Sequence, residues 1–302
     1  MKNLSLEGVL FAAKLYFKLN HLANHGESLI LQNINVQFIA VDNKPDPAHP
    51  QPATRRIAYR LRQGRAPTLV WLGGFKSDMM STKAQALDEW AAQTGFAFLR
   101  FDYSGHGESE SATPGERFQD GTISRWLEDA LAILALVQGP VILVGSSMGG
   151  WLSLLAEKTW RAKGMAGRIQ GMVLIAPAVD FTQRLMWAQF SPAIRDEIEH
   201  NGVWYLPTPH APNSWPITRA LIEDGRTQLL FGAPLDVDCP VHILQGQQDP
   251  DVPWTHAMTL MEHLPGAQAT LTLVKDGDHR LSRPQDIELL LSSVERMARS
   301  ML

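Results

Sequence analysis

One short segment limits the possible folds more than any other part of the chain. Residues 141–144 form an apolar run, residues 145–149 read Gly-Ser-Ser-Met-Gly, and a helical pattern starts directly behind them. A serine in a tight turn between a strand and a helix needs small residues two positions before and after it, because the neighbouring main chains pass close together. Gly145 and Gly149 meet this demand. Ser147 is therefore the candidate nucleophile.

Two later segments supply the base and the acid that a serine nucleophile requires. Asp249 follows the predicted buried strand 240–246, and His279 lies just behind the predicted strand 270–274. Asp251 is the rival acid. We prefer Asp249 because it lies closer to the strand end, and we expect Asp251 to cap the helix that follows. The chain order serine, aspartate, histidine is the order expected of α/β-hydrolases.

Acyl transfer also needs main-chain N–H donors for the oxyanion. Met148, the residue after the serine, is expected to supply the first. The second is expected from Phe75 or Gly74, because the strand predicted over 68–72 ends in two glycines. Gly73 stands where many esterases carry histidine. The alternative is that these glycines form an ordinary turn.

Strands and helices alternate along most of the chain. Predicted helices cover 82–94, 123–137 and 147–162, between predicted strands at 68–72, 97–102, 141–145 and 170–176. This alternation predicts an α/β fold, with a mostly parallel sheet covered by helices on both faces. Two earlier strands, 36–41 and 56–61, are expected to form a hairpin around the proline-rich linker 42–54.

The alternation stops between residues 178 and 238, where helical patterns are followed by a proline-rich stretch. We expect this insertion to form a small helical lid, and the α/β core to comprise 29–177 and 239–302. Trp187 and Trp204 in the lid, and Trp254 behind the acid loop, are candidate contacts for an apolar acyl or aryl group. The alternative is that these rings only pack the lid against the core.

Composition excludes several classes of protein. The chain has 302 residues, 45% of them hydrophobic, and a net charge of −4, so it can bury a large core but offers no basic surface for nucleic acid. Neither H-E-x-x-H nor paired cysteines occur, and no metal or organic cofactor is expected. The nine histidines other than His279 are expected to be surface or capping groups. The loop 100–109 is expected to be a tight structural turn beneath the active site, and the single Cys239 to pack in the core.

The N-terminal residues 1–28 are expected to form an amphipathic segment, in whose first 19 residues Lys2, Lys14 and Lys18 stand against a single acid, Glu7. We expect this segment to dock on the protein or to contact a membrane surface, with a cleaved targeting peptide as the alternative. No stretch reaches the ~20 apolar residues of a membrane-spanning helix. The expected location is the cytoplasm, and the alternative is an organelle reached through the N-terminal segment.

Several motifs together resemble one branch of the α/β-hydrolases: Leu99–Gly105, Gly145–Trp151, Gly202–Trp204, Val252–Trp254 and Gly277–Arg280. This branch contains the mitochondrial palmitoyl-protein thioesterases that also cleave acyl glucuronides, together with bacterial relatives. The resemblance extends from Thr68 to the C-terminus, although Gly73 departs from the usual histidine.

The resemblance implies serine-dependent hydrolysis of acyl thioesters or acyl-glucuronide esters, on small molecules or acylated proteins. Ser147, Asp249 and His279 take the triad positions. A small-molecule carboxylesterase and a carbon–carbon bond hydrolase share this triad and remain alternatives, and a ligand-binding scaffold without activity is the alternative from another class.

Overall fold

The structure, a computed structural model, describes residues 34–43, 53–207 and 214–301. The predicted amphipathic segment 1–28 and most of the linker 42–54 lie outside these residues. The described residues belong to one compact unit that begins at Ile34. None of the described helices is long and apolar enough to cross a membrane.

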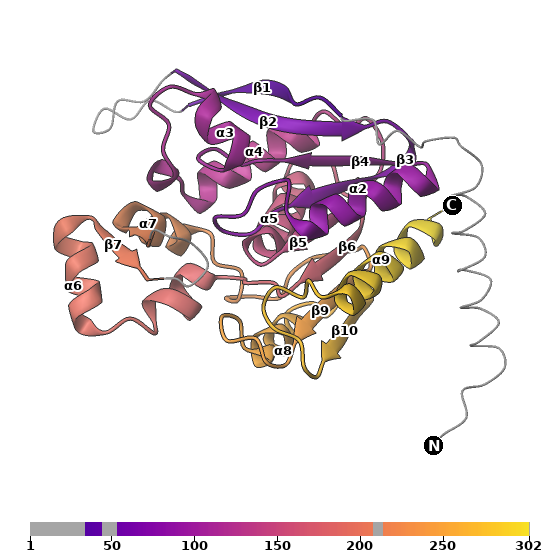
Figure 1. The fold of residues 1–302 in the computed structure, drawn as a ribbon. Helices are drawn as coiled ribbons and strands as arrows, with labels where there is room; N and C mark the ends of the chain where they lie inside the picture. Colours follow the sequence, from indigo (N-terminus) through magenta and orange to yellow (C-terminus); the bar gives the residue numbers. More distant parts are fainter. Residues whose placement is uncertain (1–33, 44–52, 208–213, 302) are drawn as a thin grey trace. The chain divides into compact units, whose positions relative to one another are not determined.

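An eight-stranded sheet forms the centre of this unit, in the order β1-β2-β4-β3-β5-β6-β9-β10 (Figure 1). The pairs β1/β2 and β2/β4 are antiparallel, and the other neighbours are parallel, which confirms the predicted mostly parallel sheet and its N-terminal hairpin. The strands are β1 (Gln37–Asp42), β2 (Thr54–Arg62), β3 (Arg65–Leu72), β4 (Phe96–Phe101), β5 (Val141–Ser146), β6 (Ile169–Ile175), β9 (Val241–Gly246) and β10 (Ala269–Val274).

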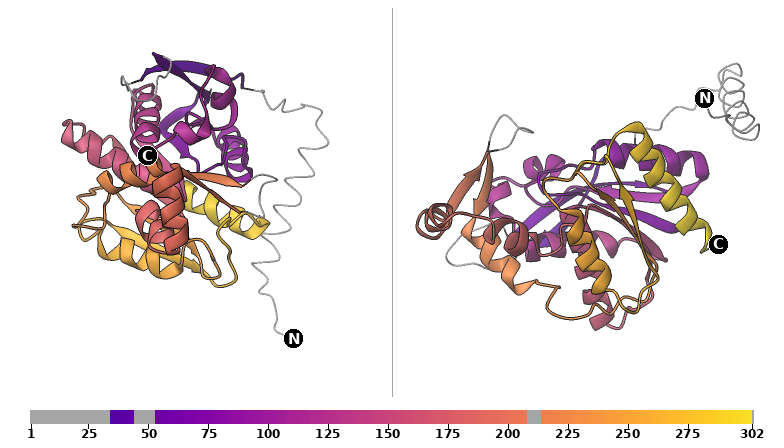
Figure 2. Two further views of the ribbon diagram at one scale, coloured as in Figure 1. Left: turned by 90° about the vertical axis from the view of Figure 1, so that its left-hand side faces the viewer. Right: turned by 90° about the horizontal axis from the view of Figure 1, so that it is seen from below.

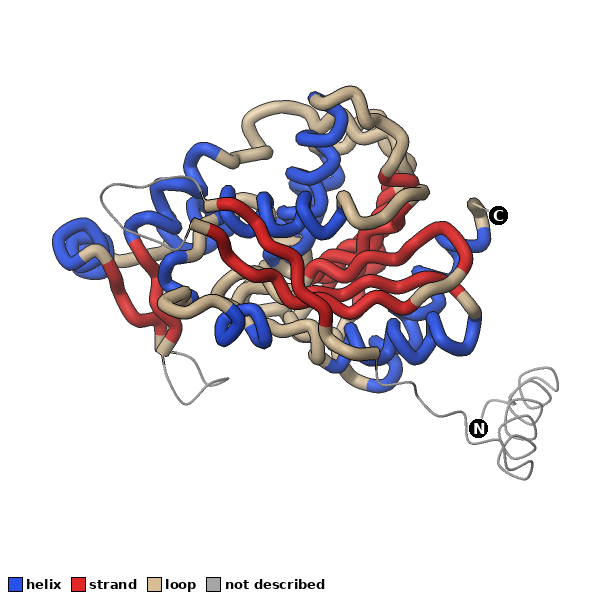
Figure 3. The backbone as a smooth tube through the Cα atoms, turned by 90° about the horizontal axis from the view of Figure 1, so that it is seen from above, coloured by secondary structure: helices blue, strands red, loops and turns tan. Residues whose placement is uncertain are grey.

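Helices cover both faces of the sheet, as predicted (Figures 2 and 3). Because side chains alternate along a strand, Val70 and Leu72 of β3 enter one core, and Leu69 and Trp71 enter the other. Helices α4, α5 and α8 pack in the first core, and α2 and α9 pack in the second. Their bounds are α2 (Thr82–Thr94), α4 (Ile123–Leu134), α5 (Met148–Ala162), α8 (Trp254–Glu262) and α9 (Pro284–Arg299).

The inserted segment lies at one end of the sheet, at the left of Figure 1. It contains the π-helical turn η2 (Thr182–Trp187), α6 (Pro192–Asn201), the antiparallel strands β7 (Val203–Leu206) and β8 (Trp215–Thr218), and α7 (Arg219–Thr227). The predicted lid was purely helical, so β7 and β8 are a correction. Proline at 216 obscured the second strand, although a two-stranded ribbon tolerates proline where no ladder hydrogen bond is needed.

The loop after β4 also differs from the prediction. It continues at Gly107 into a short helix, α3 (Gly107–Ala112), and a 3₁₀ turn, η1 (Phe118–Asp120), follows before α4. The side chain of Asp102 anchors the start of this helix, because its Oδ2 accepts the Glu108 amide. Its Oδ1 accepts the amide of Met79, in the loop after β3. The two loops are therefore tied together.

Candidate active site

Ser147 sits in the strained turn that its sequence motif predicts. Its φ of 54° and ψ of −115° are unusual for a residue with a side chain. A Cβ at Gly149 would lie 2.0 Å from the carbonyl oxygen of Leu72, and one at Gly145 would lie 2.5 Å from that of Gly149. Only glycine fits either position. The amide of Ser147 donates to the carbonyl of Ile175, which fixes the turn against β6.

Three side chains from three strand ends form one hydrogen-bonded chain. His279 Nε2 lies 3.1 Å from Ser147 Oγ, and His279 Nδ1 lies 2.8 Å from Asp249 Oδ2. A carboxylate only accepts, so Nδ1 carries the proton, and Nε2 is free to accept the serine hydroxyl. Ser147 follows β5, Asp249 follows β9 and His279 follows β10. The structure thus brings together the three predicted residues in the arrangement of a nucleophile, a base and an orienting acid.

The Asp249 side chain is fully buried, and four donors surround it. Besides His279, Gln245 Nε2 donates to Oδ2 at 3.1 Å, and the amides of Asp251 and Val252 donate to Oδ1 at 2.8 Å each. Together these donors hold the Asp249 side chain as an acceptor for the imidazole. The predicted helix-capping role of Asp251 is wrong: α8 begins after Pro253 without a side-chain cap. The amide of Asp251 instead donates a hydrogen bond to the Asp249 carboxylate.

Sequence reasoning missed two polar residues that support the hydrogen-bonded series of Ser147, His279 and Asp249. Gln245 interrupts an apolar strand four residues before Asp249, a signal that could have identified it. Lys83 of α2 is buried, and its Nζ donates to the carbonyl of Arg280, the residue after His279. Burial lowers the pKa of Lys83 to about 8. No local pattern could reveal Lys83, since almost two hundred residues separate it from the loop that it holds.

The predicted oxyanion donors lie beside the nucleophile. A Cβ on Gly74 would lie only 3.3 Å from Ser147 Cβ, so the loop after β3 passes directly along the serine. Gly74 opens a tight turn in which the Ser77 amide donates to the Gly74 carbonyl. Within the part of the chain that the structure describes, the amides of Phe75 and Met148 donate to no other residue. Both N–H groups are therefore available to a ligand.

The tryptophans predicted to contact substrate lie in different surroundings. Trp187 and Trp204 are partly buried and pack against the small core of the inserted segment, and Phe75 packs against the same core. Trp254 is 36% exposed at the start of α8. The ring of Trp215, in β8, instead lies 5.8 Å from the ring of Phe75. Trp215 is thus the tryptophan of the insertion that contacts the predicted oxyanion residue, and substrate contact by the other three stays a prediction.

Two histidines predicted to be surface or capping groups are in the core, and the prediction was wrong for them. His256 is buried, with Nε2 2.8 Å from the carbonyl of Val179. His106 is also buried, with Nδ1 3.1 Å from the carbonyl of Ser104 and Nε2 3.2 Å from the amide of Lys76. Burial lowers the pKa of His106 to about 4. Both rings satisfy main-chain groups inside the fold, which an isolated histidine in a sequence cannot reveal.

Known proteins resemble this chain along most of its length. The family model for serine aminopeptidase, S33 matches residues 56–209, about half of the chain. Mitochondrial palmitoyl-protein thioesterase ABHD10 from Homo sapiens is 31% identical over 247 residues, which cover 81% of this chain and 77% of that protein. The enzyme of that name from Mus musculus is 33% identical over 79% of this chain and 77% of its own length.

Solved structures also resemble this chain along most of its length. A protein from Agrobacterium vitis S4 matches with a TM-score of 0.79 and 44% identity, covering 87% of this chain and 99% of that one. Mouse alpha/beta hydrolase domain-containing protein 10 matches with a TM-score of 0.75 and 29% identity, over 89% and 100% of the two chains. With its predominantly parallel sheet and its serine turn, the chain is a hydrolase of the α/β-hydrolase fold and belongs to the serine aminopeptidase S33 family.

Proposed function

We propose that this chain hydrolyses carboxylic acyl thioesters and esters through an acyl-enzyme on Ser147. The observation that carries the proposal is the hydrogen-bonded chain from Ser147 Oγ through His279 to Asp249. Beside it lie the main-chain N–H groups of Phe75 and Met148, which donate to none of the residues that the structure describes. A nucleophile, a base and oxyanion donors are the groups that acyl transfer requires.

In the first step, Ser147 Oγ attacks the acyl carbonyl carbon while His279 Nε2 takes the hydroxyl proton. Asp249 stabilises the resulting imidazolium, and the amides of Phe75 and Met148 donate to the oxyanion. The bond to the leaving group then breaks, and Nε2 returns its proton to the leaving thiolate or alkoxide. A water molecule attacks the acyl-enzyme by the same route, so the acid leaves and the serine hydroxyl is restored.

Long-chain acyl thioesters are the proposed substrate class, and acylated proteins are proposed as their carriers. Two observations support this choice. The curated relatives with 31–33% identity are named palmitoyl-protein thioesterases. Aromatic rings of the inserted segment also reach the predicted oxyanion residue, since Trp215 contacts Phe75. An apolar acyl chain fits such surroundings.

The compartment is a separate proposal. The mammalian relatives carry the word mitochondrial in their names, which supports the organelle alternative, whereas a similar solved protein comes from a bacterium. We therefore propose a cytoplasmic location. The alternative is an organelle reached by targeting through residues 1–28. Imaging of the full chain with a C-terminal fluorescent fusion, with and without residues 1–28, separates the two.

The test is kcat/KM for a palmitoyl thioester, the matched palmitoyl oxyester and an acyl glucuronide, each over short to long acyl chains. We expect turnover to rise with chain length and Ser147→Ala to lower it by roughly 10⁴-fold or more. Ser146→Ala, the neighbouring serine, is the matched control and should keep its activity.

Each other outcome changes the assignment. Turnover confined to short or aryl esters would reassign the chain to the small-molecule carboxylesterases. Full turnover by Ser147→Ala would refute the acyl-enzyme. Persistent ligand binding without any turnover would indicate a scaffold.

A further inference from the structure

A buried histidine that is not part of the Ser147–His279–Asp249 series contacts the loop that carries the predicted oxyanion donor. His106 precedes α3, and its Nε2 lies 3.2 Å from the amide nitrogen of Lys76. Lys76 directly follows Phe75, whose own amide faces no acceptor in the described part of the chain. We propose that His106 is a positioning residue, whose Nε2 fixes the turn that presents the Phe75 amide to the oxyanion. This inference rests on the proposed function.

The chemistry of its two neighbours assigns the tautomer of His106. The carbonyl of Ser104 can only accept, so Nδ1 carries the proton, and the amide of Lys76 can only donate, so Nε2 carries the lone pair. A protonated ring would meet the Lys76 amide with a second donor and lose this bond. Burial, which lowers the pKa of His106 to about 4, keeps the ring neutral under ordinary conditions.

The turn needs an external anchor because of its backbone conformation. Lys76 has a φ of 60°, in the left-handed region that glycine favours, although a β-carbon occupies this position. It lies inside the tight turn closed by the bond from the Ser77 amide to the Gly74 carbonyl. The bond to His106 holds the peptide group between Phe75 and Lys76 in one orientation. Without that bond, the turn can relax to negative φ, and the Phe75 amide would shift with it.

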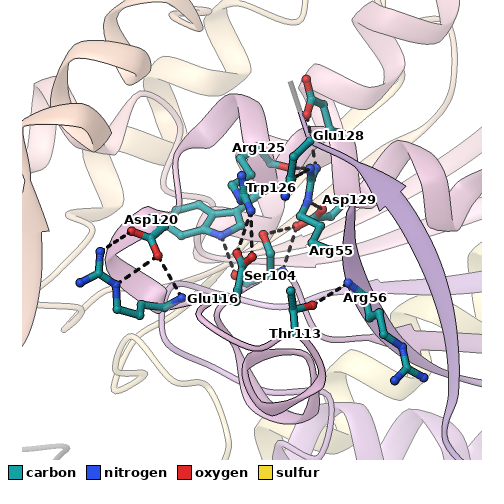
Figure 4. A network of polar contacts seen from close by, with 12 residues as sticks. Arg55, Arg56, Ser104, Thr113, Glu116, Asp120, Arg125, Trp126, Glu128 and Asp129 are labelled. Atoms are coloured by element: carbon teal, nitrogen blue, oxygen red, sulfur yellow. Dashed lines mark hydrogen bonds and ion pairs between the residues drawn. The ribbon is translucent and has the colours of Figure 1, made fainter. Parts of the chain in front are cut away.

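His106 is itself held firmly, which a positioning residue requires. The Ser104 carbonyl that accepts its Nδ1–H also accepts the indole N–H of Trp126 at 3.1 Å. The Ser104 amide and hydroxyl donate to Asp129, and Asp129 accepts Arg55 at 2.6 Å (Figure 4). This series of hydrogen bonds therefore extends from Arg55 in β2 and Asp129 in α4 to the turn beside the nucleophile.

Aromatic packing joins His106 and Phe75 a second time. The ring of Phe118 lies 4.9 Å from both rings, and the ring of Trp126 lies 5.3 Å from His106 and 5.9 Å from Phe75. Because both residues share these two neighbours, the side chain and the backbone of the turn are held by the same cluster. The hydrogen bond from Lys76 supplies the directional part of this support.

Two substitutions separate the two hydrogen bonds of His106. In His106→Asn, the short amide can still donate to Ser104 but does not reach the Lys76 amide. In His106→Gln, the longer amide places an oxygen near the position of Nε2 and keeps an acceptor for Lys76. His256→Asn is the matched control, because it also replaces a buried histidine that bonds to a main-chain carbonyl.

The readouts are kcat and KM for a p-nitrophenyl acyl ester and the affinity for a boronic acid with the same acyl chain, all measured well below the melting temperature. For His106→Asn, we expect kcat to fall roughly 10- to 100-fold, with KM changed by less than about twofold. The affinity for the boronate, which forms a tetrahedral adduct on Ser147, should fall by a similar factor. His106→Gln should recover most of the loss, and His256→Asn should keep the wild-type kcat.

Several results would overturn the inference. They are a kcat of His106→Asn within about threefold of wild type, an equal loss in His106→Gln, or an equal loss in His256→Asn. If the asparagine variant does not fold, ¹⁵N NMR of the wild-type protein decides, because a proton on Nε2 of His106 contradicts the assigned tautomer. Failure of the proposed function is distinct: the wild-type protein itself would then neither cleave the ester nor react with a fluorophosphonate at Ser147.

Discussion

The ion pair between Arg55 and Asp129 gives the sharpest prediction about stability. Both side chains are buried, and Arg55 Nε lies 2.6 Å from Asp129 Oδ1 (Figure 4). Oδ2 of the same carboxylate accepts the amide and the hydroxyl of Ser104 at 2.9 Å and 2.7 Å. Asp129→Asn keeps the volume but replaces one acceptor oxygen with a donor. The variant therefore removes the negative charge beside Arg55 and turns an N–H group against either Arg55 or the Ser104 amide.

The structure sets the expected size of the loss. Removing one partner of a buried ion pair costs about 3–5 kcal/mol of unfolding free energy. Arg55 keeps partial compensation from Glu128 at 3.3 Å and Asn43 at 2.6 Å, so we expect the lower end, about 3 kcal/mol. An unfolding entropy of about 2.1 cal/mol/K per residue over the chain converts this loss into a drop of roughly 5 °C in Tm. Glu128→Gln, whose carboxylate is partly exposed, should cost less than about 1 kcal/mol.

Urea unfolding followed by far-UV circular dichroism measures these differences, provided that the urea dependence of the unfolding free energy is the same for all variants. A double-mutant cycle tests the reasoning directly. In an Arg55→Met background the buried Asp129 carboxylate has already lost its cationic partner, so Asp129→Asn no longer breaks an ion pair and should cost at most the Ser104 contribution, about 1 kcal/mol. An equal loss in both backgrounds would refute the explanation. So would a loss for Asp129→Asn no larger than that for Glu128→Gln.

Three further predictions concern the nucleophile turn, the histidine loop and acid stability. Gly149→Ala should lower the unfolding free energy by about 3 kcal/mol or prevent folding, because its Cβ would lie 2.0 Å from a main-chain oxygen of β3. Gly139→Ala, with open space around it, should change the free energy of thermal unfolding by less than about 0.5 kcal/mol. Similar losses of unfolding free energy in Gly149→Ala and Gly139→Ala would contradict the clash. Lys83→Met should lower kcat about tenfold with little change in KM, because the loop that carries His279 loses its anchor; unchanged steady-state kinetics would show that this anchor is dispensable. Burial lowers the pKa of His106 to about 4, so between about pH 6.5 and pH 4 the unfolded chain binds a proton that the folded protein does not. The unfolding free energy from urea titrations should therefore fall by up to ~3 kcal/mol as the pH drops from about 6.5 to about 4. His106→Gln should flatten this slope, and an unchanged slope would assign the acid sensitivity to other groups.

Local patterns predicted the candidate catalytic residues because the constraints on their placement are local. The spacing of Gly145 and Gly149 around Ser147 reflects close approaches within a few residues, and those approaches are present. Strand ends in a parallel sheet meet at one edge, so placing Asp249 and His279 behind two strands was enough to predict their meeting. The same local rule failed at Asp251, because the aspartate that accepts amides before α8 is Asp249, which also bonds to His279.

The sequence by itself determined the fold class, the nucleophile turn and the order of the three polar residues, since hydrophobic period and glycine spacing act over short distances. Tertiary structure alone decided which residues support them. The bond between His106 and Lys76, the anchor from Lys83 to the histidine loop and the contact of Trp215 with Phe75 all join segments far apart in the chain. A buried polar side chain is satisfied by whichever main chain or ring the fold places beside it, and that neighbour leaves no periodic trace in the sequence.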